Sequence, residues 1–224
     1  MLQLKNISKS YPNSDRKILH ELSFDFAKGD SIAIVGPSGV GKSTLLNIIS
    51  TLDTANTGSV LFDSIDLSEL SNNEQAEFRN KKMGFVFQQH HLLLQLSLLE
   101  NVLVPTLPEK DKQKKQKAKE RALELIKWVG LSNLINQKPG QMSVGECQRT
   151  AVVRALINEP EILFADEPTG SLDIDSSNLL VDLLVDLNKK QNLTIVMVTH
   201  SMEMAAKLNK QVKLERGKLK SLAD

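Results

Sequence analysis

Hydrophobic residues along this chain follow two different patterns. In residues 21–26 apolar and polar side chains alternate, which is typical of a strand with one face in solvent and the other in a core. Three other runs, at 31–35, 162–165 and 193–199, are almost wholly apolar and rich in β-branched residues, as strands covered on both faces are. The first pattern predicts an antiparallel sheet near the N-terminus, and the second predicts a parallel α/β core.

Helical periodicity lies between these runs. We expect one helix at about 43–50, a second over about 113–129 and a third over the leucine-rich segment 179–187, with Asp175 or Ser176 placed to cap it. The apolar residues of the second and third helices recur at the spacing of one helical face. Those expected to face a core are Ala118, Ala122, Leu125, Ile126, Val129, Leu179, Leu180, Leu183, Leu184 and Leu187.

Residues from about 90 to 155 show helical patterns and no convincing strand. This stretch predicts a helical subdomain inserted into the α/β core, within one domain that spans residues 1–224. Residues 211–222 predict a hairpin that turns at Arg216 and Gly217.

The composition is that of an ordinary globular protein, with 224 residues, 41% hydrophobic and 25% charged. A net charge of +1 gives no reason to expect a nucleic-acid partner, and we interpret the basic run at 110–121 as the solvated face of a helix. No apolar run reaches the roughly 18 residues that span a bilayer, and the N-terminus lacks the layout of a signal peptide. The single cysteine, Cys147, agrees with a reducing compartment and is interpreted as a packed side chain. These features predict a cytoplasmic location.

A glycine-rich segment, GPSGVGKST, separates the first apolar run from the first expected helix. Gly36, Gly41, Lys42 and Ser43 satisfy the spacing G-x-x-x-x-G-K-[ST], in which backbone amides surround phosphates at a helix N-terminus. Lys42 would reach the β and γ phosphates, Ser43 would offer its hydroxyl to Mg²⁺, and Thr44 could bond the α phosphate. The alternative is a turn that only joins strand to helix. The remaining loop residues that we expect to line the nucleotide are Ser38 and Gly39.

Two other apolar runs end in polar residues suited to phosphate chemistry. Asp166 and Glu167 follow the run at 162–165; the first could hold a water on Mg²⁺, and the second could orient or deprotonate an attacking water. His200 follows the third run and could lie near the γ phosphate. The alternatives are a surface turn for the two acids and a capping or core role for the histidine.

Taken together, these segments resemble the ATP-binding-cassette ATPases over essentially the whole chain. The first motif looks like their Walker A, ILFADE their Walker B, Ser171–Asp173 their D-loop and VTHS their switch histidine. Gln88 matches the Q-loop, in that family a ligand for Mg²⁺ and a sensor of the membrane partner. Tyr11 matches the aromatic residue that stacks on adenine, although by its position alone it could be an ordinary strand residue.

The segment MSVGECQR matches the signature motif of that family, whose serine and glycine amides meet the γ phosphate bound by the opposite subunit. By this resemblance Ser143, Gly145 and Glu146 contribute to the nucleotide site. The resemblance implies a P-loop NTPase (RecA-like) core with an N-terminal antiparallel β subdomain and an inserted helical subdomain. It also implies ATP and Mg²⁺ as cofactors and a homodimer with composite ATP sites. Membrane-spanning permease subunits would hold this dimer at the cytoplasmic face of the inner membrane.

One residue departs from the signature motif, because Val144 stands where the family has glycine. A β-branched residue resists positive φ and adds bulk beside the incoming phosphate. Valine is tolerated if the backbone there is helical; otherwise the chain binds ATP well and hydrolyses it slowly.

The spacing and the segments GFVFQQHHLLLQLSLLENV and FADEPTGSLD are most similar to the LolD, MacB and FtsE group, and favour its lipoprotein-releasing members. A cell-division ATPase and a slow ATP-gated switch remain alternatives. A soluble cassette acting on ribosomes or DNA would predict paired cassettes or a long coiled-coil insertion, and neither is visible. We leave His90 and His91 open between exposed loop residues and partner contacts. The leucines at 92–99 are expected both to fill a core and to line a groove for a short helix of the membrane subunit.

Overall fold

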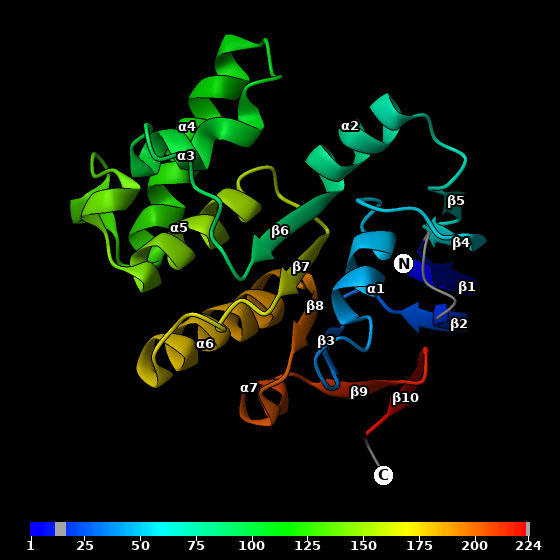
Figure 1. Ribbon diagram of the computed structural model, residues 1–224. Coiled ribbons are helices and arrows are strands. Elements are labelled where there is room, and N and C mark those ends of the chain that lie inside the picture. Colours follow the sequence, from blue (N-terminus) through cyan, green and yellow to red (C-terminus); the bar gives the residue numbers. More distant parts are fainter. Residues whose placement is uncertain (12–16, 223–224) are drawn as a thin grey trace.

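The computed structural model describes residues 1–11 and 17–222 of the chain. The N-terminal strands form a four-stranded antiparallel sheet in the order β2-β1-β4-β5 (Figure 1). Alternate residues of this sheet are buried, among them Leu2 and Leu4 in one strand and Leu22 and Phe26 in the next. The antiparallel sheet predicted from the alternating pattern is therefore confirmed. Its strands are β1 (Leu2–Ser10), β2 (Lys17–Phe26), β4 (Thr57–Phe62) and β5 (Ile65–Asp66).

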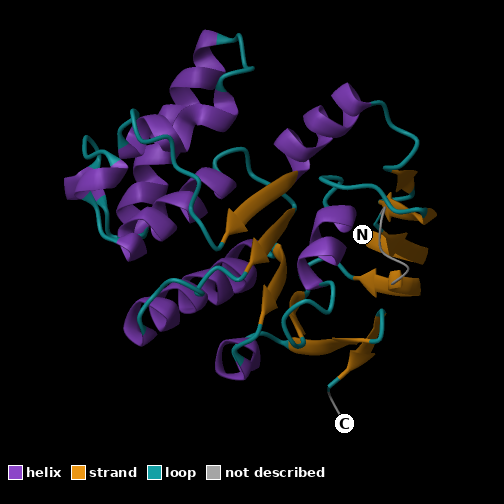
Figure 2. Ribbon diagram, in the orientation of Figure 1, coloured by secondary structure: helices purple, strands orange, loops and turns teal. Residues whose placement is uncertain are grey.

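The second sheet has six strands in the order β10-β9-β3-β8-β7-β6 (Figure 2). The three apolar runs form its centre as the parallel neighbours β3, β8 and β7, which confirms the predicted α/β core. The expected hairpin is also present, and both turn residues, Arg216 and Gly217, have positive φ. The strands are β3 (Ser31–Val35), β6 (Met83–Phe87), β7 (Ile162–Asp166), β8 (Thr194–Thr199), β9 (Lys210–Glu215) and β10 (Lys218–Ser221).

Strand β6 extends the parallel part of the sheet and has no counterpart among the predicted strands. It is short and contains Gly84, which weakens the strand pattern. A Cβ on Gly84 would lie 2.6 Å from the carbonyl oxygen of Ala155, so this glycine allows helix α5 to pack closely on the strand. Sequence periodicity carries no signal for such a contact.

The helices are α1 (Lys42–Ile49), α2 (Asn72–Lys82), α3 (Leu98–Leu103), α4 (Lys112–Trp128), α5 (Val144–Leu156), α6 (Ile174–Gln191) and α7 (Met202–Ala206). Helices α3, α4 and α5 pack against one another beyond the β6 edge of the sheet, as Figure 1 shows. No strand interrupts residues 88–161, as expected from the sequence. Helix α1 lies between the two sheets, where Leu45 and Leu46 are buried in a common core.

The structure corrects the predicted start of α6. Its N-cap is Asp173, neither Asp175 nor Ser176, because the Asp173 carboxylate accepts a hydrogen bond of 2.8 Å from the backbone N–H of Ser176. The predicted apolar face is also partly wrong, since Leu179 is 48% exposed while Leu180 and Leu184 are buried.

Candidate active site

The loop between β3 and α1 has the backbone of a phosphate-binding loop. Gly41 has a φ of +107°, and a Cβ at this position would lie 2.4 Å from Cγ2 of Ile18. Gly39 has a φ of +74°, with no atom within 4 Å of its Cβ position, so this part of the loop is open. Ser38 is exposed in the same loop, and Thr44 is half-buried in the first turn of α1. The glycines are therefore required by backbone conformation and by the approach of β2.

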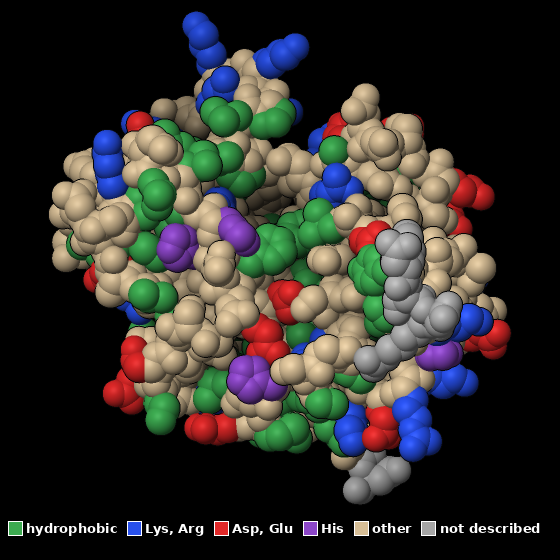
Figure 3. All heavy atoms as spheres, viewed as in Figure 1, with side chains coloured by type: hydrophobic (Ala, Val, Ile, Leu, Met, Phe, Trp, Pro, Cys, Tyr) green, Lys and Arg blue, Asp and Glu red, His purple; other side chains and the backbone are tan. Residues whose placement is uncertain are grey.

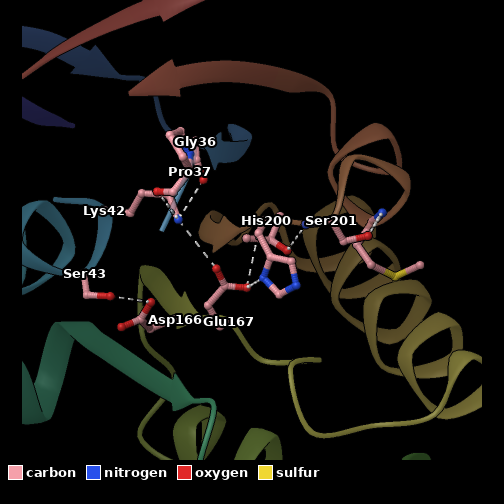
Figure 4. A network of polar contacts seen from close by, with 10 residues as sticks. Gly36, Pro37, Lys42, Ser43, Asp166, Glu167, His200 and Ser201 are labelled. Atoms are coloured by element: carbon pink, nitrogen blue, oxygen red, sulfur yellow. Dashed lines mark hydrogen bonds and ion pairs between the residues drawn. The ribbon is translucent and has the colours of Figure 1, made fainter. Parts of the chain in front are cut away.

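Lys42 is the buried cation of the site, with 7% of its surface exposed. Its Nζ donates hydrogen bonds to the carbonyl oxygens of Gly36 (2.9 Å) and Pro37 (3.2 Å), and lies 3.8 Å from Oε1 of Glu167 (Figure 4). The ammonium group is thus held between the loop backbone and an acid at the end of β7.

Ser43 and Asp166 form a hydroxyl–carboxylate pair across the site. The Ser43 hydroxyl donates to Oδ1 of Asp166 over 3.1 Å. The pKa of Asp166 is raised, mainly because the carboxyl group is buried. The hydrogen bond from Ser43 opposes this rise. The negative charge of Glu167 adds to the rise, and the positive charge of Lys42 reduces it. Mg²⁺ in nucleotide sites is held by a hydroxyl or one or two carboxylates together with phosphate oxygens. This donor set fits that ion, and no cluster of three or more His, Cys, Asp or Glu occurs in residues 1–11 and 17–222 to hold a metal without the nucleotide.

Glu167 connects the ends of two neighbouring strands. Its backbone is left-handed, with a φ of +47°, and its N–H donates to the carbonyl oxygen of Val198 over 2.9 Å. Its Oε2 accepts from the backbone N–H of His200 (3.2 Å) and lies 2.8 Å from Nδ1 of that residue. Because a carboxylate can only accept, Nδ1 of His200 carries the proton in this contact. A strained backbone next to a converging acid, cation and histidine is typical of a catalytic site.

Gln88 lies at the same edge of the sheet. Phe87 pairs with Asp166 in the ladder of β6 and β7, so Gln88 follows directly at the carboxyl end of the strand. Its carbonyl oxygen accepts from the Ser171 hydroxyl over 3.3 Å, and its side chain packs on Gly170, where a Cβ would lie 2.8 Å from Nε2. The structure therefore brings the expected Q-loop and D-loop segments together, a contact between residues distant in the sequence.

Tyr11 is fixed within the antiparallel sheet region. Its hydroxyl donates to Oδ2 of Asp53 over 3.0 Å, and Nζ of Lys9 lies 4.9 Å from the centre of its ring. Burial would raise the pKa of Asp53, but hydrogen bonds from Lys9, the Thr54 N–H and Tyr11 lower it overall. The ring itself is 40% exposed, which leaves aromatic surface open for stacking.

The expected signature residues form the start of α5. Ser143 is the N-cap, and Ser143 and Glu146 form a capping box with bonds of 2.7 and 3.3 Å. A Cβ on Gly145 would lie 3.2 Å from Oγ of Ser176, so the starts of α5 and α6 adjoin. In the part of the chain that the structure describes, no hydrogen bond joins these residues to Lys42.

Val144 is the first residue of α5, is 51% exposed and does not have positive φ. The condition under which valine is tolerated at this position is met. Ser143 and Val144 at the start of α5 are exposed, and they form no hydrogen bond with the phosphate-loop lysine of the same chain in the described residues.

The leucine run that was expected to line a groove is divided in the structure. Leu92 and Leu98 are buried, whereas Leu93 and Leu94 are 48% and 63% exposed. A cavity of about 770 Å³ lies instead between α2, the turn at Val104–Thr106 and α4, and none of these leucines lines it. Figure 3, viewed as in Figure 1, shows this hollow between the part of the molecule that contains α4 and the part that contains α2. Its walls include Glu77, Asn80, Lys81, Pro105, Glu109, Lys114, Lys115 and Asn158.

Comparison with known proteins gives concordant results. The family model described as "ABC transporter" matches residues 19–170. The lipoprotein-releasing system ATP-binding protein LolD of Colwellia psychrerythraea is 42% identical over 226 residues, covering 100% of this chain and 87% of that protein. LolD of Pseudoalteromonas translucida is 43% identical over 221 residues, covering 98% and 94%.

The fold is similar to solved structures of another cassette over the full length of both chains. A dimeric post-hydrolysis structure of MJ0796 bound to ADP and Pi has a TM-score of 0.87 and 34% identity, and a second dimeric structure of that bacterial ABC transporter cassette has 0.88 and 36%. In the described residues of the present chain, no helix is long and apolar enough to cross a membrane.

Proposed function

Given that this chain belongs to the ABC transporter family, as an ATP-hydrolysing subunit, we propose that two copies of it drive a membrane complex that releases lipoproteins. The membrane complex would hold the two copies of this chain at the cytoplasmic face of the inner membrane. The observation that carries the proposal is the convergence of Lys42, Ser43, Asp166, Glu167 and His200 at one edge of the sheet. Permease subunits would supply the path through the membrane and the contact with the lipoprotein.

Within one copy, each residue of the site has a distinct task. The loop amides and Lys42 bind the phosphates, and Tyr11 offers its ring to the base. Ser43, Asp166 and Gln88 hold Mg²⁺, which when bound neutralises part of the phosphate charge. The donor types and positions described above support the assignments of the loop, Lys42, Ser43 and Asp166, and the family resemblance supplies those of Gln88 and Tyr11.

Glu167 orients the attacking water and accepts its proton, while His200 holds the carboxylate in place and faces the γ phosphate. In the reaction the water oxygen bonds to the γ phosphorus, the bond from that phosphorus to the β–γ bridging oxygen breaks, and ADP and phosphate leave. The proton passes from Glu167 to solvent.

The start of α5 would complete the site of a second copy. Ser143 is exposed and Gly145 is half-buried at the start of this helix, and helix N-termini favour anions. Dimeric structures of the similar cassette MJ0796 support such an arrangement. ATP would then lie between two copies, and its hydrolysis would allow them to separate.

The cavity between α2 and α4 is the surface on which we expect a short cytoplasmic helix of the membrane subunit to dock. Of its lysines, Lys81 and Lys114 form ion pairs with Glu77 and Glu109, which leaves a mixed rather than a strongly basic lining. Motion of the two copies would reach the membrane subunit at this point.

The proposal is tested by phosphate release from the full chain, alone and reconstituted in proteoliposomes with the membrane subunits encoded beside it. Glu167→Gln should reduce turnover at least about 100-fold, the lower range for loss of a general base. Glu69→Gln, which changes an exposed loop acid, is the matched control and should leave turnover unchanged.

Release of a lipoprotein from those proteoliposomes should require ATP and the intact Glu167. Turnover without lipoprotein release would retain the ATPase and reject the proposed cargo. No phosphate release above background from the wild-type complex would reject both.

A further inference from the structure

The segment that contains Gln88 is held by its backbone carbonyl groups. Gln148 Nε2 donates to the Phe87 carbonyl oxygen over 2.7 Å. The two terminal nitrogens of Arg154 donate to the carbonyl oxygens of His90 and His91, each over 2.6 Å. Both donors come from helix α5, so this helix holds the chain on either side of Gln88.

The segment needs such support because it has no regular structure of its own. Residues 88–97 lie outside any helix or strand. His91 has a left-handed backbone with a φ of +48°, which is costly for a residue other than glycine. A strained conformation persists only where its surroundings over-determine it. Arg154 of α5 supplies that constraint at His90 and His91, while Asn101 of α3 holds the backbone of Leu93 and Leu96 further along the segment.

Arg154 is well suited to this task. Its guanidinium group presents donors in a fixed fork, which can hold two adjacent carbonyl oxygens at once. Burial lowers the pKa of Arg154, and no acid forms an ion pair with it in residues 1–11 and 17–222. The two carbonyl bonds are therefore the main compensation for removing its charge from water.

Gln148 adds a second, fully buried attachment. Its side chain is 0% exposed, and its Oε1 has no partner among the described atoms. The bond from Nε2 to Phe87 is thus the one polar contact that orients this amide in the described structure. Loss of Gln148 Nε2 would also remove this hydrogen bond from the Phe87 carbonyl oxygen.

We propose that Arg154 and Gln148 are positioning residues that fix Gln88 relative to the signature end of helix α5. The helix runs without interruption from Val144 to Leu156, and Ser143 caps its start. Ser143 and the Gln88 segment are therefore attached to one rigid element. The inference rests on the proposed function: in a dimer, Ser143 would meet the partner's nucleotide while Gln88 holds the metal of its own site. Through α5, closure at one site would adjust the metal ligand of the other.

The first test is the Mg²⁺ dependence of ATP hydrolysis by the full chain. Arg154→Lys keeps the charge but loses the fork, and should raise the Mg²⁺ concentration for half-maximal turnover about 10-fold, as loss of an outer-shell partner does. The KM for ATP at saturating Mg²⁺ should change less than about threefold, because the phosphate loop is untouched. Arg79→Lys is the control: Arg79, in helix α2, donates to the carbonyl and hydroxyl oxygens of Thr51, each over 2.8 Å, and neither bond involves the segment that contains Gln88.

A double-mutant cycle separates positioning from a general structural role. Gln88→Ala should itself raise the Mg²⁺ requirement, and adding Arg154→Lys should then have little further effect, because the residue acts through Gln88. If Arg154→Lys does not fold, as judged from its melting temperature, Gln148→Leu takes its place in the cycle.

Independent, additive effects of the two changes would overturn the inference, as would an unchanged Mg²⁺ requirement in a folded Arg154→Lys chain. If Gln88→Ala leaves the Mg²⁺ requirement unaltered, the proposed metal role of Gln88 fails and the inference falls with it. If Gln88→Ala raises the requirement and Arg154→Lys does not, only the positioning role of α5 is rejected.

Discussion

At the residue scale, Asp166 and Glu167 are adjacent acids with different surroundings. Glu167 is compensated by Lys42 at 3.8 Å and by two nitrogens of His200. Asp166 receives one hydrogen bond, from Ser43, and burial raises its pKa. A residue placed for a ligand at the expense of the fold is expected at functional sites. Asp166 is such a residue, and the stability that the chain loses by burying its carboxylate can be measured.

Asp166→Asn should stabilise the chain in the absence of nucleotide and Mg²⁺. A carboxyl group whose pKa is raised by folding favours the folded state when protonated, and this contribution is lost as pH rises through its folded pKa. The asparagine variant should therefore melt at a higher temperature than the wild type at pH 7, by about 2–4 °C for a gain of about 1 kcal/mol. The difference should shrink as the pH falls and vanish below about pH 3, roughly one unit under the ordinary aspartate pKa, where Asp166 is protonated in both the folded and the unfolded chain.

Thermal unfolding followed by circular dichroism across this pH range is the measurement. Asp25→Asn, at an exposed position of β2, should leave the melting temperature nearly unchanged and is the control. A variant less stable than the wild type at pH 7 would show that the Ser43 bond outweighs the cost of burial.

At the element scale, the start of helix α5 explains how this chain accommodates valine. The capping box of Ser143 and Glu146 starts the helix before Val144, so the residue has no need of the freedom of glycine. Its side chain is half exposed and lies outside the core. The local backbone thus gives no reason for slow turnover.

Val144→Gly should leave ATP turnover within about twofold of the wild type and lower the free energy of unfolding by about 0.5–1 kcal/mol, the cost of glycine in a helix. Steady-state phosphate release and urea unfolding measure the two quantities. Val144→Ala removes the bulk but keeps helix propensity, and should match the wild type in both. A tenfold rise in turnover for both variants would favour the slow ATP-gated switch instead.

At the scale of the whole molecule, the residues that we expect to bind nucleotide form two separate halves within one copy. Lys42 and its neighbours gather at the edge of the six-stranded sheet, while Ser143 caps helix α5 and exchanges its capping bonds with Glu146 of the same helix. The assignment of each residue to phosphate, metal or water stays a prediction, as does the extent of the single domain over residues 1–224. Pairing of two copies is the event that would unite the halves.

The Glu167→Gln chain should therefore form a dimer with MgATP and remain a monomer with MgADP, because only ATP presents a γ phosphate to the partner's Ser143. Size-exclusion chromatography with light scattering measures the mass. Adding Ser143→Ala should abolish pairing at micromolar concentrations; its melting temperature is measured alongside, since loss of the cap costs about 1 kcal/mol. Dimers that form equally well with that change would indicate pairing through another face.

Several features of this protein follow from local sequence patterns alone. Burial on both faces demands the apolar runs that became β3, β7 and β8, and the turn at Arg216 and Gly217 needs residues that accept positive φ. The phosphate loop is equally local, because glycine spacing and a following helix suffice to define it. These signals arise within a few residues, so the sequence by itself determined the core, the hairpin and the loop.

The tertiary structure decided which distant residues meet. Strand β6 escaped prediction because its Gly84 serves contact with a helix 71 positions later, at Ala155. Glu167 reaches His200 across 33 residues, Gln88 meets Ser171 across 83, and Arg154 holds His91 across 63. Such contacts depend on strand order and helix packing, which bring distant loops to one edge of the sheet. Local hydrophobic periodicity carries no signal for these contacts. Residue chemistry was therefore set by the sequence, and its arrangement into a site was set by the fold.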